Sequence, residues 1–307
     1  MLRVYPLRLE FAARDTIRFP AGKPGNVLRG AFGHIFRNIV CDPACPGART
    51  CEKRDSCPYA RIFEPSASAP GPSGLADWPR PFVFRAGHLD GKTVRAGDNF
   101  HFDLNIFEMR EPAIQHFTRA FAVLGDEGLG PGRGRANLSA VHQIAPDGSL
   151  TEPGLPLELN LNPPATEVQH LRVEFLTATE LKAGKYLSER PEFRVLFSRA
   201  RDRVSALCSL YQHGQPDLDF RGMGQRAAAV AMTRCEVNWR DAKRHSSRTG
   251  QVHPLGGFAG EAEYTGRIGE FVPILHAAQW TGVGRHTVWG KGVIRIAECA
   301  AASRTTQ

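Results

Sequence analysis

The chain has 307 residues, of which 42% are hydrophobic and 23% are charged, so it is long enough to form two globular domains that each bury a core. Lys and Arg (39) outnumber Asp and Glu (31), which gives a formal net charge of +8 and favours an anionic partner, nucleic acid ahead of an acidic membrane surface. The sequence contains no apolar run long enough to cross a membrane and begins with no signal-peptide pattern, which predicts a cytoplasmic protein with no membrane partner.

The first predicted elements are a strand and a helix. Residues 3–11 alternate apolar and polar side chains imperfectly around Pro6, and we expect an edge strand because proline cannot donate a ladder hydrogen bond. Asn26 is predicted to cap a helix whose apolar side chains recur at helical spacing from Val27 to Val40.

The predicted strands and helices of the first half continue after an irregular segment. Residues 41–81 are rich in cysteine and then in Pro, Gly and Ser, which indicates an inserted loop. A strand over 100–106 and a helix with Pro112 in its first turn follow. A glycine-rich loop at 128–135 ends this helix, and a last strand is expected over 138–144.

The second half repeats this order. A strand is predicted near 171–175, a helix over 193–211, two strands near 229–239 and 258–264, and a helix around 271–278. A second glycine-rich loop at 282–292 and a strand at 293–297 complete it.

Strand, helix, two strands, helix and strand describe a ferredoxin-like unit. We therefore predict an α+β fold of two tandem ferredoxin-like (RRM-like) domains, each ending in a helix, a glycine-rich loop and a strand. The expected boundaries are 1–150 for the first domain with its insertion at 41–81, 151–166 for a linker and 167–307 for the second domain.

Both glycine-rich loops are also basic. Glycine lets a backbone approach a phosphate and expose its N–H groups, and the interleaved Arg133, Arg135, Arg285 and Lys291 supply opposite charge. The alternative is a pair of helix-ending turns that use glycine for positive φ. Because each loop carries more glycines and cations than a turn needs, the sequence favours contact with a nucleic-acid backbone.

Four motifs in order resemble Cas6, the CRISPR repeat-processing endoribonuclease of the RAMP superfamily. They are Leu28-Arg29-Gly30-Ala31-Phe32-Gly33-His34, the cysteine segment ending at Cys57-Pro58-Tyr59, the first glycine-rich loop, and the stretch from Trp239 to Gly292. The cysteines place the chain nearest a cysteine-bearing branch. The second loop departs from the family pattern at Arg285-His286 and Trp289, where the basic and aromatic character is nevertheless kept.

The resemblance implies cleavage of precursor crRNA within the repeat by metal-independent transesterification, with no cofactor for catalysis. His34 would be the acid or base, because relatives often use a histidine of the first helix region. Counting 100° per residue puts His34 on the same side as Gly30, Gly33 and Arg37, so Arg37 is expected to meet a phosphate. Lys291 is the second expected catalytic cation. The alternative is a surface histidine on a helix whose glycines serve close packing.

The RNA-binding residues that we expect lie in the two loops and in the basic run after Trp239. They are Arg133, Arg135, Arg244, His245, Arg248, Gly282, Gly284, Arg285, His286, Gly290 and Gly292. The basic run is equally well interpreted as a solvated face.

Cys41, Cys45, Cys51 and Cys57 are separated by three, five and five residues, a looser spacing than that of paired zinc knuckles. Four thiolates in so short a loop can still close a tetrahedral site, so structural zinc is favoured over an iron-sulfur cluster or a redox-labile loop. Two other functions stay open. The chain could be a non-cleaving RAMP subunit that binds guide RNA beside other Cas effector subunits, or a general RNA-recognition protein, although the RNA-recognition signature strand is missing from the sequence.

Overall fold

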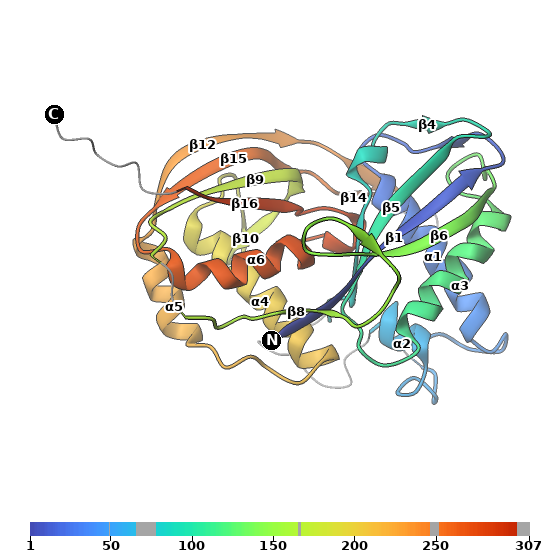
Figure 1. The fold of residues 1–307 in the computed structure, drawn as a ribbon, viewed down its shortest axis with the longest axis horizontal. Coiled ribbons are helices and arrows are strands. Elements are labelled where there is room, and N and C mark those ends of the chain that lie inside the picture. The colour runs from blue at the N-terminus through green and yellow to red at the C-terminus, as the bar shows by residue number, and fades with distance from the viewer. Residues whose placement is uncertain (49, 66–77, 165–166, 246–251, 300–307) are drawn as a thin grey trace.

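The computed structural model describes residues 1–48, 50–65, 78–164, 167–245 and 252–299. Two antiparallel sheets lie side by side, and each carries helices on one face (Figure 1). In both sheets the first and third core strands pair at the centre and the second and fourth lie outside them. This order confirms the predicted pair of tandem ferredoxin-like domains.

The N-terminal sheet has the order β3-β5-β1-β6-β7, with β8 paired to one end of β1. Its strands are β1 (Leu2–Ala13), β3 (Phe82–Arg85), β5 (Asn99–Ile106), β6 (Ala136–Ile144), β7 (Leu150–Thr151) and β8 (Leu157–Leu159). Helices α1 (Pro24–Val40) and α3 (Ala113–Glu127) pack against each other and share one aromatic core with the sheet, in which Phe32 stacks on Phe117. The short strands β2 (Ile17–Arg18) and β4 (Thr93–Val94) pair with each other as a separate two-stranded sheet.

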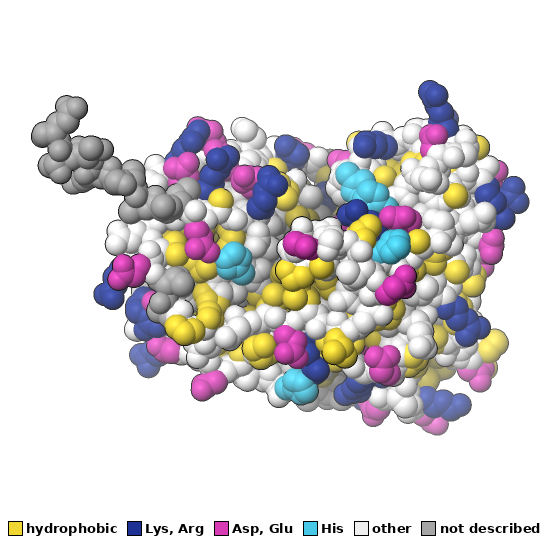
Figure 2. Space-filling view, in the orientation of Figure 1, with side chains coloured by type: hydrophobic (Ala, Val, Ile, Leu, Met, Phe, Trp, Pro, Cys, Tyr) yellow, Lys and Arg dark blue, Asp and Glu magenta, His cyan; other side chains and the backbone are white. Residues whose placement is uncertain are grey.

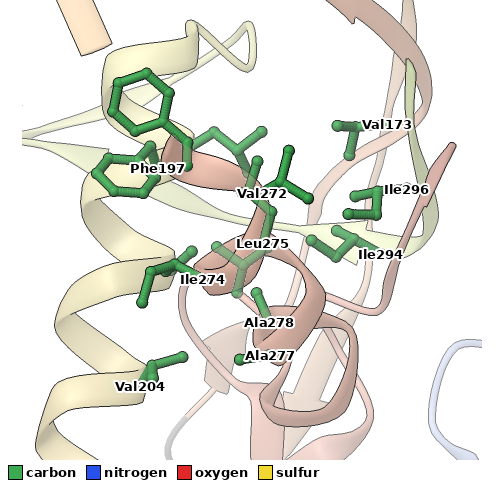
Figure 3. Packing of buried hydrophobic residues seen from close by; sticks show 14 of the residues in the cluster. Val173, Phe197, Val204, Val272, Ile274, Leu275, Ala277, Ala278, Ile294 and Ile296 are labelled. Atoms are coloured by element: carbon green, nitrogen blue, oxygen red, sulfur yellow. The ribbon is translucent and has the colours of Figure 1, made fainter. Parts of the chain in front are cut away.

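The C-terminal sheet has the order β12-β15-β9-β16. Its strands are β9 (His170–Thr179), β12 (Ala231–Arg240), β15 (Gly257–Thr265) and β16 (Ile294–Cys299). Helices α4 (Phe193–Tyr211) and α6 (Val272–Thr281) bury their apolar faces against this sheet, as Figure 3 shows for Phe197, Ile274 and Ile296. The short α5 (Phe220–Arg226) follows α4. Two hairpins project from this domain, β10 (Leu181–Ala183) with β11 (Tyr186–Ser188), and β13 (Lys243–His245) with β14 (Val252–Pro254).

The edge position that we expected for the first strand is wrong. β1 is central, pairing with β5 on one side and with β8 and β6 on the other. On that second side, β8 pairs residues 2–4 and β6 pairs from Leu7 onward, so Tyr5 and Pro6 fall in the gap between the two strands. The proline therefore interrupts one ladder without excluding the strand from the middle of the sheet.

Three further boundaries differ from expectation. The first helix begins at Pro24 and not with a cap at Asn26, because proline at the first helical position needs no hydrogen-bond acceptor for its nitrogen. Strand β3 was not predicted, and within the predicted insertion Pro58–Ile62 forms a helix, α2, whose Tyr59 and Ile62 are buried in the core. The expected linker contributes β8 to the N-terminal sheet.

The two domains meet at the C-terminal end of α6. Arg85 of β3 donates to the carbonyl oxygens of Gln279 and Trp280, and Asn105 Nδ2 lies 2.8 Å from the Trp280 oxygen. From the other side, Arg203 Nε of α4 lies 2.8 Å from the Thr281 oxygen. These carbonyls carry the negative end of the helix dipole and would otherwise be unsatisfied, so the cations stabilise both the helix end and the interface.

Further contacts join the domains away from this helix end. Gln212 both accepts from the Arg3 N–H at 2.8 Å and donates to the Arg3 carbonyl at 2.7 Å. Leu2, Val83 and Phe107 of the N-terminal domain are buried in the hydrophobic cluster of the C-terminal domain. The interface is thus a continuous part of the core.

We predict that Asn105→Ala lowers the free energy of unfolding by about 0.5–1.5 kcal/mol, because the part-buried Trp280 carbonyl loses one of its two donors and keeps Arg85. Urea unfolding followed by circular dichroism measures this. Asn137→Ala, at an exposed asparagine of β6, is the matched control and should change stability by less than about 0.5 kcal/mol. Equal effects of the two substitutions would remove Asn105 from the interface.

Candidate functional site

His34 lies on the exposed side of α1 and opens into a small pocket. The pocket has a volume of about 240 Å³ and is shared with the loop that follows α3, through Gly128, Gly130 and Arg133. Glu127, at the end of α3, also lines it. The structure therefore brings together the expected catalytic histidine and one of the expected RNA-binding arginines, from residues almost a hundred positions apart.

The geometry of the first glycine-rich loop presents Arg133 to solvent. Arg133 has a φ of 48°, and Gly128 must be glycine because a Cβ there would lie 2.2 Å from the Arg133 carbonyl oxygen. The Arg133 side chain is 72% exposed, and its Nη2 is 3.8 Å from Glu127 Oε2. Because an exposed ion pair at this distance is weak, the guanidinium can exchange the carboxylate for a phosphate.

The neighbours of His34 on α1 only partly match expectation. Gly30 faces open space, but Gly33 is covered by the Phe63 ring, where a Cβ would lie 1.9 Å from a ring carbon. Of these two glycines, only Gly30 therefore leaves part of the helix surface uncovered and open to close approach by another chain. Arg37 Nη2 donates to the Cys45 carbonyl at 3.2 Å, so this side chain lies on the cysteine segment one turn beyond His34. Asn38 Nδ2 is 3.5 Å from His34 Nε2. This polar neighbour of His34 was not predicted from the sequence.

The second glycine-rich loop packs against its own domain. A Cβ at Gly284 would lie 2.3 Å from the Glu180 carbonyl oxygen, and one at Gly292 would lie 1.9 Å from the Val283 oxygen. The N–H groups of Gly282, Gly290 and Gly292 donate to carbonyls of the protein. These three amides are not exposed for a phosphate, contrary to expectation, because the loop uses its positive-φ glycines for tight internal turns.

The polar side chains of this loop gather around a buried carboxylate. Glu180, 3% exposed, is ion-paired with Arg285 and lies 3.9 Å from His286 Nε2. His286 stacks on Trp289 with 4.8 Å between ring centroids. His286 is therefore held among protein groups, whereas the Arg285 side chain stays 47% exposed and can reach a ligand.

Lys291 lies in a larger cleft between the two domains. This cleft, of about 760 Å³, is lined by side chains of both charges from both domains: Lys23, Arg85, Arg240 and Lys291 together with Asp90, Asp103 and Asp241. Lys291 Nζ donates to the Gly22 carbonyl at 3.0 Å, and burial lowers the pKa of its ammonium group. The cleft meets α1 at Gly25, nine residues before His34 and thus about 13 Å away along the helix. The structure does not place Lys291 and His34 in one pocket.

The remaining RNA-binding candidates lie elsewhere. Arg135 is ion-paired with Asp15 at 2.7 Å, and hydrogen bonding to Arg135 lowers the pKa of the Asp15 carboxyl. Arg244 and His245 belong to β13 of a hairpin that was not predicted, in which Arg244 is opposite His253. Arg248 lies outside the described residues.

The four clustered cysteines are neighbours in space. The thiol of Cys41 contacts those of Cys45 and Cys57, and Cys45 contacts Cys51. Burial and the adjoining thiols raise the pKa of Cys41 to about 12, whereas the Gly47 N–H lowers the pKa of Cys45. The donor chemistry suits zinc. Within the described ranges, however, no group of three or more His, Cys, Asp or Glu side chains is arranged closely enough to hold a metal ion.

The open face of the C-terminal sheet carries an ion-pair network. Arg172 and Arg234 pair with Glu261, and Arg295 pairs with Glu174. Acidic and basic side chains are likewise interspersed over the face of the molecule shown in Figure 2. A surface whose cations are paired with carboxylates in this way attracts a phosphate chain weakly, which favours the loops and the cleft as the anion-binding regions. None of the described helices combines the length and apolar character needed to cross a bilayer.

Comparison with known proteins identifies both halves. The family model AF_1859_N, described as an N-terminal domain, matches residues 2–159. The model described as CRISPR-associated endoribonuclease Cas6 matches residues 173–294. No curated protein matches the sequence.

Solved Cas6 structures share the fold over almost the whole chain. A Cas6 (TTHB231) product complex has 16% identity and a TM-score of 0.58, covering 96% of this chain and 100% of that one. Thermus thermophilus Cas6 (TTHB231) has 14% identity and a TM-score of 0.55, covering 97% and 99%. A partial Cas6-RT-Cas1–Cas2 complex has 11% identity and a TM-score of 0.57, with 97% of this chain matching 46% of that one.

The order of motifs, the paired ferredoxin-like domains and the two family matches agree. The chain is a Cas6-type protein whose N-terminal domain belongs to the AF_1859_N family.

Proposed function

We propose that this chain binds CRISPR repeat RNA and cleaves precursor crRNA within the repeat by metal-independent transesterification. The observation that carries the proposal is the pocket shared by His34 and Arg133. It combines a group able to transfer protons near neutral pH with an exposed cation, and both open to solvent where a strand can enter.

The chemistry requires two proton transfers and neutralisation of added charge. The ribose 2′-oxygen attacks phosphorus, the bond from phosphorus to the 5′-oxygen breaks, and the products are a 2′,3′-cyclic phosphate and a 5′-hydroxyl. His34 would take the 2′-hydroxyl proton or donate a proton to the leaving 5′-oxygen. Arg133 would neutralise the phosphorane, and Arg37 would contact the strand one helical turn away. His34 thus supplies one of the two proton transfers, and water would carry the other.

Lys291 has a different part in this proposal from the catalytic one that the sequence indicated. Since it lines the cleft between the domains with Lys23 and Arg240, Lys291 would bind the RNA backbone at a position distant from the scissile phosphate. The other cationic candidates, Arg135, Arg244, Arg248 and Arg285, would extend this contact along the strand. Solved Cas6-RT-Cas1–Cas2 complexes support a further proposal, that this chain can associate with other Cas proteins.

His34→Ala should reduce the single-turnover cleavage rate by about 10²- to 10⁴-fold, because the proton-transfer group is lost. Affinity for uncleavable 2′-deoxy repeat RNA should be unchanged. The assay is run in EDTA, with His213→Ala, an exposed histidine beyond α4, as the control. Wild-type protein that binds the repeat but never cuts it would instead identify a non-cleaving RAMP subunit.

Arg133→Gln should lower the cleavage rate at saturating protein by about 10²- to 10³-fold, since a cation facing the phosphorane is removed. Lys291→Gln should weaken binding and reduce the salt slope of log Kd by about 0.7 per lost phosphate contact, with the saturated rate unchanged. Anisotropy titrations between low and moderate salt give the slopes. If Lys291→Gln instead lowered the saturated cleavage rate and left the salt slope unchanged, Lys291 would belong to the active site.

We also propose that Cys41, Cys45, Cys51 and Cys57 hold a structural zinc ion, on the strength of their thiolate donor chemistry and their pairwise proximity. The four side chains would have to close around the ion, because the described side chains form no group close enough to hold a metal. The thiols would bind as thiolates and fix the segment that Arg37 contacts. Elemental analysis should find about one zinc per chain, which Cys45→Ser removes together with several degrees of thermal stability. A cobalt-substituted protein without thiolate absorption bands would contradict this assignment.

A further inference from the structure

The hairpin of β10 and β11 exposes a tyrosine that no part of its own domain covers. Its two strands pair only with each other, and Gly184 at the turn has a φ of 61°. Tyr186 is 76% exposed and Leu187 is 43% exposed, which makes Tyr186 the most exposed aromatic side chain of the described residues. An isolated two-stranded hairpin is marginally stable in water, so a partner that covered the exposed Tyr186 ring would stabilise it.

The base of the hairpin is fixed on the second glycine-rich loop. Leu181 is buried, and its side chain lies 3.0 Å from the position of a Cβ on Gly284. Glu180, directly before β10, accepts from the Arg285 N–H at 3.0 Å and is ion-paired with the Arg285 side chain. The exposed tip therefore stands on the loop whose Arg285 is a candidate RNA contact.

The charge at the tip favours a polyanion. Lys185 is exposed in the turn next to Tyr186, whereas Lys182 is exposed on the other face of the hairpin, because Lys182 pairs with Leu187 and Tyr186 with Ala183. No ion pair to a described carboxylate engages either lysine. An aromatic ring beside a lysine is suited to a single strand, because a base stacks on the ring while the ammonium group contacts a phosphate. A protein partner that recognised Tyr186 and Leu187 would gain little from two unpaired lysines beside them.

We propose that the β10–β11 hairpin binds a single-stranded part of the repeat RNA, with one base stacked on Tyr186 and a neighbouring phosphate held by Lys185. This rests on the proposed function, since it names a second contact of the same RNA. It places Tyr186 in binding and not in the reaction at His34, because the hairpin belongs to the C-terminal domain and the His34 pocket is formed by α1 and the loop after α3.

The test compares Tyr186→Ala with Tyr186→Phe by anisotropy with a 2′-deoxy-blocked repeat RNA. Tyr186→Ala should raise Kd by about 5- to 150-fold, the range for one lost base stack, and Tyr186→Phe should match the wild type. The single-turnover cleavage rate at saturating protein should be the same for all three. Leu155→Ala, at a side chain 87% exposed in the segment between the domains, is the matched control for loss of exposed apolar surface.

Each outcome decides the proposal. Unchanged affinity of Tyr186→Ala would overturn it and leave the hairpin as a surface for another protein. Equal losses in the Ala and Phe variants would overturn base stacking as the mode of contact. Circular dichroism confirms that each variant is folded. If the wild type cleaves nothing but Tyr186→Ala still loses affinity, the proposed nuclease function fails and the hairpin contact stands.

Discussion

The end of α6 is the point on which the arrangement of the two domains depends. Three successive carbonyls there accept hydrogen bonds from Arg85 and Asn105 of one domain and from Arg203 of the other. Burial lowers the pKa of Arg85 to about 10 and that of Arg203 to about 9, so water contributes little to their solvation and the helix end must do so. Arg85 also lines the cleft that contains Lys291, so this contact lies directly beside the cleft.

The four sheet strands and two long helices of the C-terminal domain were predicted because they keep regular apolar periodicity, whereas its two hairpins and α5 were not. The N-terminal domain was harder to predict for specific reasons. Phe82, Val83 and Phe84 of β3 are all buried, so the strand shows no alternation and is too short to stand out from the insertion before it. Pro6 was given too much weight, because a strand with two different partners on one side can leave a proline in the gap between them.

The candidate site, like the fold, was predicted from the sequence only in part. His34 and Arg133 could be found separately as a helix residue and a loop residue, and the fold explains their meeting. Both helices of a ferredoxin-like unit pack on one face of the sheet, so a loop that ends α3 returns beside α1. The sequence could not show that most glycines of the second loop face their own domain, because internal turns and phosphate cradles use the same residue type. Nor could it show that Lys291 donates to Gly22, just before α1 begins and well before the histidine.

Gly25 has a consequence for how the two repeats evolved together. A methyl group at this position would lie 2.5 Å from the Trp289 carbonyl oxygen, so the first turn of α1 rests directly on the second repeat. The height of α1 along its own axis, and with it the placement of His34 relative to Arg133, is therefore set by a backbone contact in the other half of the molecule. Substitutions in the two halves are therefore not independent. A bulkier side chain at position 25 would shift α1 and misplace His34 without contacting it.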